Sequence, residues 1–158
     1  MLGVVAYIGM GGNLGSREQN LQAAAVRLDE MPGIAVKRVS RFIETKPEGG
    51  PPGQDNYLNA AAEIETTLSP TELLRALHEI EAALKRDHAN EPRWGSRTCD
   101  LDILLMGELV LNESDLTIPH PRMHERRFVL GPLSQIAPEV VHPVLKRTVA
   151  ELLAALEH

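Results

Sequence analysis

The chain has 158 residues, of which 43% are hydrophobic and 24% charged, and its net charge at pH 7 is −6. This composition suits one globular domain, residues 1–158, and argues against a protein that binds nucleic acid through a generally basic surface. The only cysteine, Cys99, excludes an internal disulfide and favours a reducing compartment, and no run of about 18 apolar residues predicts a membrane span.

Two hydrophobic periods alternate along the chain, one typical of strands and one typical of helices. In chain order they predict a strand over 2–9, a helix from Ser16 to Pro32, strands over 34–45 and 57–68, a helix from Ser69 to about Arg86, a strand over 98–106 with 108–111 as its hairpin partner, a short helix opened by the segment 117–128, and a last helix from Thr148. Ser16, Ser69 and Thr148 each stand three residues before a glutamine or glutamate, which is the form of a helix-capping box.

The order strand-helix-strand-strand-helix-strand is that of a ferredoxin-like βαββαβ core. Such a core is an α+β fold, with an antiparallel sheet and helices packed on one of its faces. We therefore expect the other face to be free to build a site, with a C-terminal hairpin and short helices added after the core.

A glycine-rich segment, GMGGNLG, lies between the first predicted strand and the first predicted helix. Its spacing does not match the G-x-G-x-x-G fingerprint of dinucleotide-binding proteins, and no Lys-Ser or Lys-Thr pair follows it as in a P-loop. We predict a tight structural turn at this position.

Two aspartates interrupt the last core strand, in the segment RTCDLDILLMG. Asp100 and Asp102 share one face of the strand, because side chains two positions apart point the same way, whereas Leu101 and Ile103 point into the core. Two neighbouring carboxylates repel each other unless a cation lies between them, and a few oxygen ligands suit Mg²⁺ bound to phosphate. The alternative is an exposed sheet face with ion pairs to nearby arginines, and the spacing alone does not decide.

Arginines precede these aspartates, at positions 86, 93 and 97, and a second group lies within 122–127. The guanidinium fork matches the geometry of a phosphate group. Carboxylates that hold Mg²⁺, together with arginines that reach the same polyphosphate, favour phosphoryl transfer, which needs no nucleophilic side chain.

Tyr57 and Asn59 open the third predicted strand and share one face of it. A ring and an amide placed together suit a flat heterocycle, held by stacking and by hydrogen bonds at its edge. Taken alone, a core tyrosine and a turn asparagine are the commoner case. Phe128 is either a second stacking ring or a core anchor.

Trp94 lies in a polar loop that offers little core in which to bury an indole. His120 is fixed between two prolines and is placed to reach a phosphate, although a lone loop histidine is more often only a surface residue. His124 and His142 are assigned to the surface.

Five blocks of sequence occur in a characteristic order: AYIGMGGNLGS, YLNAA, RWGSRTCDLDILL, TIPHPRMHERRFVLGPL and IAPE. Together they extend along most of the chain, from residue 6 to residue 139, and resemble the 6-hydroxymethyl-7,8-dihydropterin pyrophosphokinase family of folate biosynthesis. The resemblance implies a cytoplasmic enzyme, expected to be a monomer, that transfers pyrophosphate from ATP to the hydroxymethyl group of the dihydropterin and releases AMP.

The resemblance also implies a role for each residue that matches the family motifs. Asp100 and Asp102 would bind two Mg²⁺ ions that bridge the ATP phosphates, and Arg86 and Arg97 would contact these phosphates. Tyr57 and Phe128 would sandwich the pterin, with Asn59 and Thr45 at its edge. The ATP site would be lined by His78, Glu81, His88, Arg93, Trp94, Ile103, His120 and Arg126.

The chain departs from the family pattern at three positions: Gly12 replaces a usual serine, Lys85 a common glycine, and His88 an arginine that often contacts ATP. Two other functions stay open. A palm-type nucleotidyltransferase or cyclase uses paired aspartates on a similar sheet but releases pyrophosphate. A non-catalytic protein would bind pterin and nucleotide and form no AMP.

Overall fold

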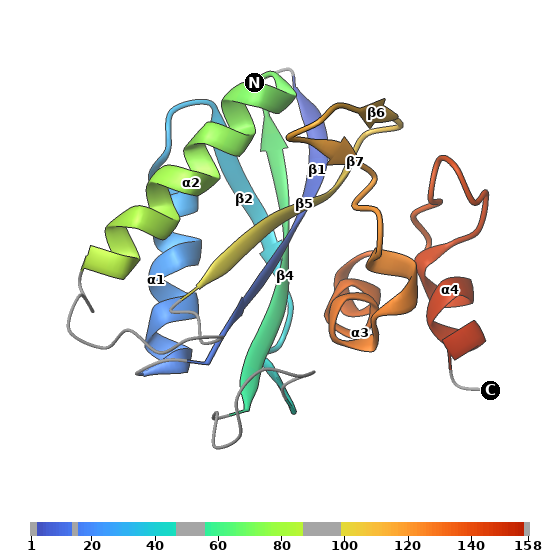
Figure 1. Cartoon of the computed structure of the whole chain (residues 1–158), viewed down its shortest axis with the longest axis horizontal. Helices are drawn as coiled ribbons and strands as arrows, with labels where there is room; N and C mark the ends of the chain where they lie inside the picture. Colours follow the sequence, from blue (N-terminus) through green and yellow to red (C-terminus); the bar gives the residue numbers. More distant parts are fainter. Residues whose placement is uncertain (1–2, 14–15, 47–55, 87–98, 157–158) are drawn as a thin grey trace.

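The computed structural model describes residues 3–13, 16–46, 56–86 and 99–156, and its centre is a five-stranded antiparallel sheet (Figure 1). The elements are β1 (Val4–Gly12), α1 (Arg17–Glu30), β2 (Ile34–Val39), β3 (Ile43–Thr45), β4 (Tyr57–Thr66), α2 (Pro70–Arg86), β5 (Asp100–Met106), β6 (Leu111–Asn112), β7 (Thr117–Ile118), a 3-10 turn η1 (Met123–Glu125), α3 (Arg127–Ile136) and α4 (Val149–Leu156). The strands lie in the order β2-β4-β1-β5, and β3 also pairs with β4. Among the described helices, none has both the length and the apolar character needed to cross a membrane.

Helices α1 and α2 cover one face of the sheet and enclose the larger hydrophobic core (Figure 1). The helical spacing of four apolar residues of α2, Leu73, Leu77, Ile80 and Leu84, predicts a stripe that faces the core, and all four side chains are buried. The ferredoxin-like βαββαβ arrangement predicted from the sequence is therefore the observed core of an α+β fold.

The second face of the sheet is only partly free, which the sequence patterns did not indicate. Leu104 and Leu105 of β5 pack in a second hydrophobic cluster with Leu130 and Leu133 of α3. Helix α4 packs in turn against α3, on the side of the sheet opposite α1 and α2 (Figure 1). The part of this face that α3 leaves open lies next to the N-terminus of that helix.

Two of the three predicted capping boxes form. Ser69 and Thr148 each exchange hydrogen bonds with the glutamate three residues later, and these bonds lower the pKa of Glu72 and Glu151. Ser16 makes no such bond, so that prediction is wrong. Its ψ of 83° lies short of the extended values that aim an N-cap hydroxyl at the first turn of a helix.

The strand predicted over 34–45 is interrupted, and Ser40 lies at the interruption. Its backbone N–H donates to the carbonyl of Ala61 at 2.8 Å, while its hydroxyl accepts from the N–H of Ala61 at 2.9 Å. A side chain thus replaces one backbone ladder bond, and the chain bends there before β3 rejoins β4.

The hairpin predicted between 98–106 and 108–111 is wrong. Gly107 adopts a φ of +54° and turns the chain away from β5, and β6 then pairs with β7 instead. The outer edge of β5 is met by a later segment, because the N–H of His120 donates to the carbonyl of Leu104 at 3.0 Å. This bond places His120 beside the strand that carries the two aspartates.

His142 is buried, contrary to the expectation of a surface histidine, with 5% of its surface exposed. Its Nδ1 atom accepts hydrogen bonds from the backbone N–H groups of Val144 and Leu145, at 3.2 and 3.1 Å. Its ring packs edge-on against His124, with the ring centroids 6.4 Å apart. The neutral ring, with no proton on Nδ1, therefore stabilises the turn between the last two helices.

We expect the free energy of unfolding to fall in mild acid because of His142. Burial, with repulsion from His124, lowers the pKa of folded His142 below its ordinary value of 6.5, so the unfolded chain takes up a proton at higher pH than the folded chain. The contribution of neutral His142 to the free energy of unfolding is complete at pH values above the ordinary pKa. It is lost as the pH falls from that pKa toward the lower pKa of His142 in the folded protein. Urea unfolding at about pH 7.5 and about pH 5.5 measures this loss.

A matched variant separates His142 from the other titrating groups. His142→Asn keeps an acceptor oxygen near the position of Nδ1 but does not titrate, so it should lose less stability than the parent over the same pH interval. Equal losses in the two proteins would contradict the assignment.

Candidate active site

A pocket of about 250 Å³ opens on the part of the second sheet face that α3 leaves uncovered. It is lined by residues from β1, β3, β4, β5, the segment after β7 and the start of α3: Gly9, Met10, Gly11, Thr45, Lys46, Tyr57, Asn59, Ala60, Asp100, Asp102, Leu104, His120, Arg126, Phe128 and Val129. The structure thus brings together eight of the predicted site residues, which are Thr45, Tyr57, Asn59, Asp100, Asp102, His120, Arg126 and Phe128.

The floor of this pocket is the glycine-rich end of β1. Gly11 pairs with Asn59 of β4 on one side and with Asp100 of β5 on the other. Because adjacent strands lie about 4.8 Å apart, Asn59 and Asp100 stand about 10 Å apart across β1. The prediction of a tight turn for GMGGNLG is thus wrong for its first part, since β1 runs through to Gly12.

The two aspartates have the orientation that the strand period predicts. Leu101 and Ile103 are buried on the helix-covered face, whereas Asp100 and Asp102 line the pocket on the other face. Asp102 is exposed and Asp100 half-buried. The pair is about 7 Å apart along the strand.

The two carboxylates of Asp100 and Asp102 line the pocket and are oxygen ligands of the kind that suits Mg²⁺. Within the described ranges, no group of three or more His, Cys, Asp or Glu residues could hold a metal ion. Mg²⁺ is commonly held in this way, through one or two carboxylates together with water and substrate phosphate oxygens.

His120 lies in the pocket beside Asp102, and its protonation state is set by its surroundings. Burial lowers its pKa below the ordinary value; the negative charge of Asp102 opposes this shift, and the positive charges of Arg126 and Arg122 add to it. Its Nδ1 atom accepts from the backbone N–H of Arg122 at 3.3 Å. A neutral ring with this acceptor carries its proton on Nε2, which is then available as a hydrogen-bond donor.

Aromatic and polar groups form the other half of the pocket. Tyr57 and Phe128 are both half-buried, and the guanidinium carbon of Arg126 lies 5.5 Å from the centroid of the Phe128 ring. Asn59 is buried, and its Nδ2 atom donates to the hydroxyl of Thr45 at 2.6 Å. Arg126 therefore joins the aromatic half of the pocket to the half that contains Asp102 and His120.

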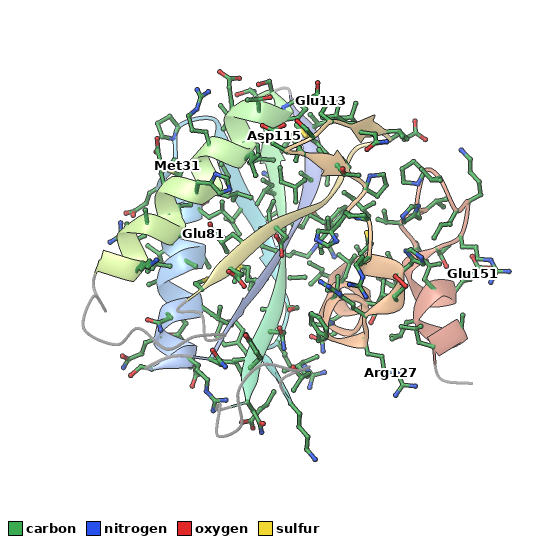
Figure 2. The ribbon with its side chains drawn as sticks, viewed as in Figure 1. Met31, Glu81, Glu113, Asp115, Arg127 and Glu151 are labelled. Carbon is green, nitrogen blue, oxygen red and sulfur yellow. The ribbon has the colours of Figure 1, made fainter. Side chains whose placement is uncertain are left out.

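Three predicted ATP-site residues lie outside this pocket. Ile103 is buried in the larger core, and His78 is exposed on α2. Glu81 projects from α2 toward the sheet (Figure 2), where its Oε2 atom accepts from the N–H of Leu101 at 2.7 Å. This bond ties α2 to the strand segment between the two aspartates.

Cys99 precedes Asp100 in the chain, but its side chain belongs to the larger hydrophobic core and does not line the pocket. It is buried, and burial, with the negative charges of Asp100 and Glu81, raises its thiol pKa to about 12. A thiol with this pKa is not a thiolate at neutral pH, so the arrangement does not support cysteine catalysis.

Five predicted residues are not placed. His88, Arg93, Trp94 and Arg97 lie outside the described residues, as does the side chain of Arg86, so their roles stay predictions.

Sequence reasoning missed several residues that line the pocket, chiefly Gly9, Gly11 and Lys46. The two glycines alternate along β1 on the face that carries Tyr7, and this period-two spacing was the available signal. Lys46 directly follows Thr45, but no pattern in the sequence distinguishes it from the polar loop that it begins.

Comparison with known proteins gives consistent matches. Residues 7–138 match the family model described as 7,8-dihydro-6-hydroxymethylpterin-pyrophosphokinase (HPPK). A 2-amino-4-hydroxy-6-hydroxymethyldihydropteridine pyrophosphokinase from Bacillus subtilis is 45% identical over 136 residues, which are 86% of this chain and 80% of that protein. The enzyme of the same name from Haemophilus influenzae is 43% identical over 140 residues, covering 89% and 86% of the two chains.

Solved structures resemble the fold at much lower identity. A Plasmodium falciparum HPPK-DHPS triple mutant matches with a TM-score of 0.76 at 14% identity, over 98% of this chain. An HPPK-DHPS in complex with substrates matches with a TM-score of 0.75, also at 14% identity and over 98% of this chain. This chain spans 43% of each of those longer chains, and at this identity the likeness shows the fold alone.

Proposed function

This chain belongs to the 7,8-dihydro-6-hydroxymethylpterin-pyrophosphokinase family, a family of folate-biosynthesis enzymes, and from that premise we propose its reaction. The chain transfers pyrophosphate from ATP to the hydroxymethyl group of 6-hydroxymethyl-7,8-dihydropterin in a Mg²⁺-dependent step. The products are AMP and the pterin diphosphate. The observation that carries the proposal is a single pocket in which two carboxylates face a pair of aromatic rings and a buried amide.

Asp100 and Asp102 would hold the metal, as two Mg²⁺ ions in the form that the resemblance implies. Both carboxylates line the pocket, and the coordination positions they leave open suit phosphate oxygens. Bound Mg²⁺ would supply neutralisation of phosphate charge, which is the main requirement of phosphoryl transfer.

Arg126 and His120 bind the phosphates in this proposal. The Arg126 guanidinium lies at the border between the two halves of the pocket, where it can form paired hydrogen bonds with phosphate oxygens. His120 donates from Nε2, because its Nδ1 already accepts the N–H of Arg122. Arg86 and Arg97 are proposed to contact the same phosphates. The part of the nucleotide site beyond this pocket is proposed to include His78, Glu81 and Ile103, which lie outside the pocket, together with His88, Arg93 and Trp94.

Tyr57 and Phe128 stack on the two faces of the pterin, and the Asn59 amide binds its edge, at which Thr45 also lies. Stacking fixes the plane of the ring and the edge hydrogen bonds fix its rotation within that plane. The hydroxymethyl group is then directed at the phosphates beside Asp100 and Asp102.

In the reaction the hydroxymethyl oxygen gives up its proton to water and forms a bond to the β-phosphorus of ATP. The bond from that phosphorus to the oxygen bridging the α- and β-phosphates breaks, and AMP leaves with that oxygen. The residues of the pocket contribute by aligning the two substrates and by neutralising charge, so no nucleophilic side chain is required.

Residues 1–158 act as one catalytic domain, a monomer that works on small molecules in the cytoplasm, without nucleic-acid or membrane partners. The acidic net charge and the single cysteine support this description.

The test is an assay of the products. With ATP, Mg²⁺ and 6-hydroxymethyl-7,8-dihydropterin, the protein should release one AMP for each pterin diphosphate formed. Chelation of Mg²⁺ by EDTA should abolish AMP formation, and added Mg²⁺ should restore it. Release of inorganic pyrophosphate instead of AMP would indicate a nucleotidyltransferase and overturn the proposal.

A further inference from the structure

The amide of Asn59 is held in one orientation by residues on two neighbouring strands. Asn59 is 5% exposed, yet it lines the pocket, so its side chain is embedded and reaches the cavity with few atoms. On the β3 side, the hydroxyl of Thr45 accepts a hydrogen bond from Nδ2 at 2.6 Å. Thr45 pairs with Tyr57 in the β3–β4 ladder, so its side chain reaches Asn59 diagonally across the strands.

On the β1 side, Gly11 faces the oxygen of the same amide. Gly11 and Asn59 are directly paired between β1 and β4, and a Cβ atom added to Gly11 would lie 2.8 Å from Asn59 Oδ1. Its other nearest atom, the carbonyl oxygen of Leu58, would be 3.7 Å away, an ordinary contact. A side chain at position 11 would therefore disturb the amide and leave the backbone in place.

We infer that Thr45 and Gly11 are positioning residues, which fix the Asn59 amide and thereby determine the hydrogen-bonding edge that the pocket accepts. This inference rests on the proposed function and adds a specificity element to it. With one Nδ2 hydrogen bound to Thr45, Asn59 has a second Nδ2 hydrogen and Oδ1 left for a ligand. The pocket then selects heterocycles that present an acceptor and a donor side by side, as the lactam edge of a pterin does.

If the Asn59 amide were rotated, Nδ2 and Oδ1 would exchange places. The donor of Asn59 would then meet the donor of the ligand, and the acceptor of Asn59 would meet the acceptor of the ligand. Recognition of a ligand edge by buried hydrogen-bonding groups is strongly discriminating, because a mismatched ligand leaves these groups without partners. Loss of the Thr45 hydroxyl should therefore weaken binding of the pterin without affecting the carboxylates of β5.

The test compares Thr45→Val with Thr45→Ser, because valine keeps the shape and backbone of threonine but lacks the hydroxyl. We expect Thr45→Val to raise the KM for the dihydropterin about tenfold while kcat changes less than about threefold. Thr45→Ser should stay near the parent in both constants. Fluorescence titration of the pterin into each protein measures the same effect on Kd.

A double-mutant cycle shows whether Thr45 acts through Asn59. In an Asn59→Ala background, Thr45→Val should have no further effect on pterin Kd, since the amide it positions is gone. Gly11→Ala should weaken pterin binding on its own and should likewise have no effect once Asn59 is alanine. Additive effects in the cycle, or a Thr45→Val protein that binds like the parent, would overturn the inference.

These outcomes are separable from failure of the proposed function. A parent protein that neither binds the dihydropterin nor forms AMP would refute the proposed reaction. A parent that does both, together with additive variants, refutes only the positioning role of Thr45 and Gly11.

Discussion

Replacing Asp102 by alanine is expected to lower kcat for AMP formation at least about 1,000-fold. Asp102 is exposed in the pocket, so its loss would remove the proposed metal ligand without opening a cavity in the core. Only one of the two carboxylates proposed to hold Mg²⁺ would then remain, so the negative charge of the polyphosphate in the transition state would be less well neutralised. Steady-state AMP formation at saturating ATP and Mg²⁺ measures the effect.

Two companion variants make this result specific. Asp102→Asn keeps the size of the side chain but removes its charge, and should be nearly as impaired as the alanine variant. Glu108→Ala removes an exposed carboxylate just beyond the end of β5, outside the pocket, and should leave kcat near that of the parent. An Asp102→Ala protein within about tenfold of the parent would refute the metal assignment.

Leu130→Ala is expected to lower the free energy of unfolding by about 3 kcal/mol. Leu130 is fully buried in the cluster that joins α3 to β5 and β4, together with Leu133 of the same helix. Removing three of its carbons leaves a cavity that the surrounding side chains fill only in part. Urea unfolding monitored by circular dichroism measures the change.

The matched control is Val144→Ala, because Val144 is 55% exposed and lies in the turn before α4. It should change the free energy of unfolding by less than about 0.5 kcal/mol. Since α3 carries Phe128 near its N-terminus, Leu130→Ala should also raise the KM for the pterin as the temperature approaches its lowered midpoint. Equal stability of the two variants would mean that α3 contributes little to the fold.

The larger hydrophobic core could be predicted, because the sequence patterns that indicate it are local. The period of two in β5 placed Asp100 and Asp102 on one face, and the period of 3.6 in α2 identified its buried stripe. Both patterns depend only on residues a few positions apart. The gathering of Tyr57, Phe128 and the aspartates in one pocket was expected from the family resemblance, not from these local patterns.

The features that were missed depend on contacts between distant segments. The docking of α3 on the second sheet face buries Leu104 and Leu133 in one cluster, and no local pattern indicates which face a late helix will cover. His142 is held in its buried position by two hydrogen bonds that its ring accepts from backbone N–H groups of the same turn. The failed hairpin depended on Gly107, whose positive φ redirects the chain.

The distribution of pocket residues along the chain has a consequence for synthesis on the ribosome. The floor of the pocket is made early, with Gly9 and Gly11, and the carboxylates of Asp100 and Asp102 follow, but Phe128 is made much later. Chains grow at about 5–20 residues per second, and a domain generally folds as a unit. A nascent chain that ends after β5 therefore contains both aspartates but only one of the two aromatic residues, Tyr57 and Phe128, that line the pocket. On the function proposed above, we expect pterin binding only once α3 has been synthesised and packs on the sheet.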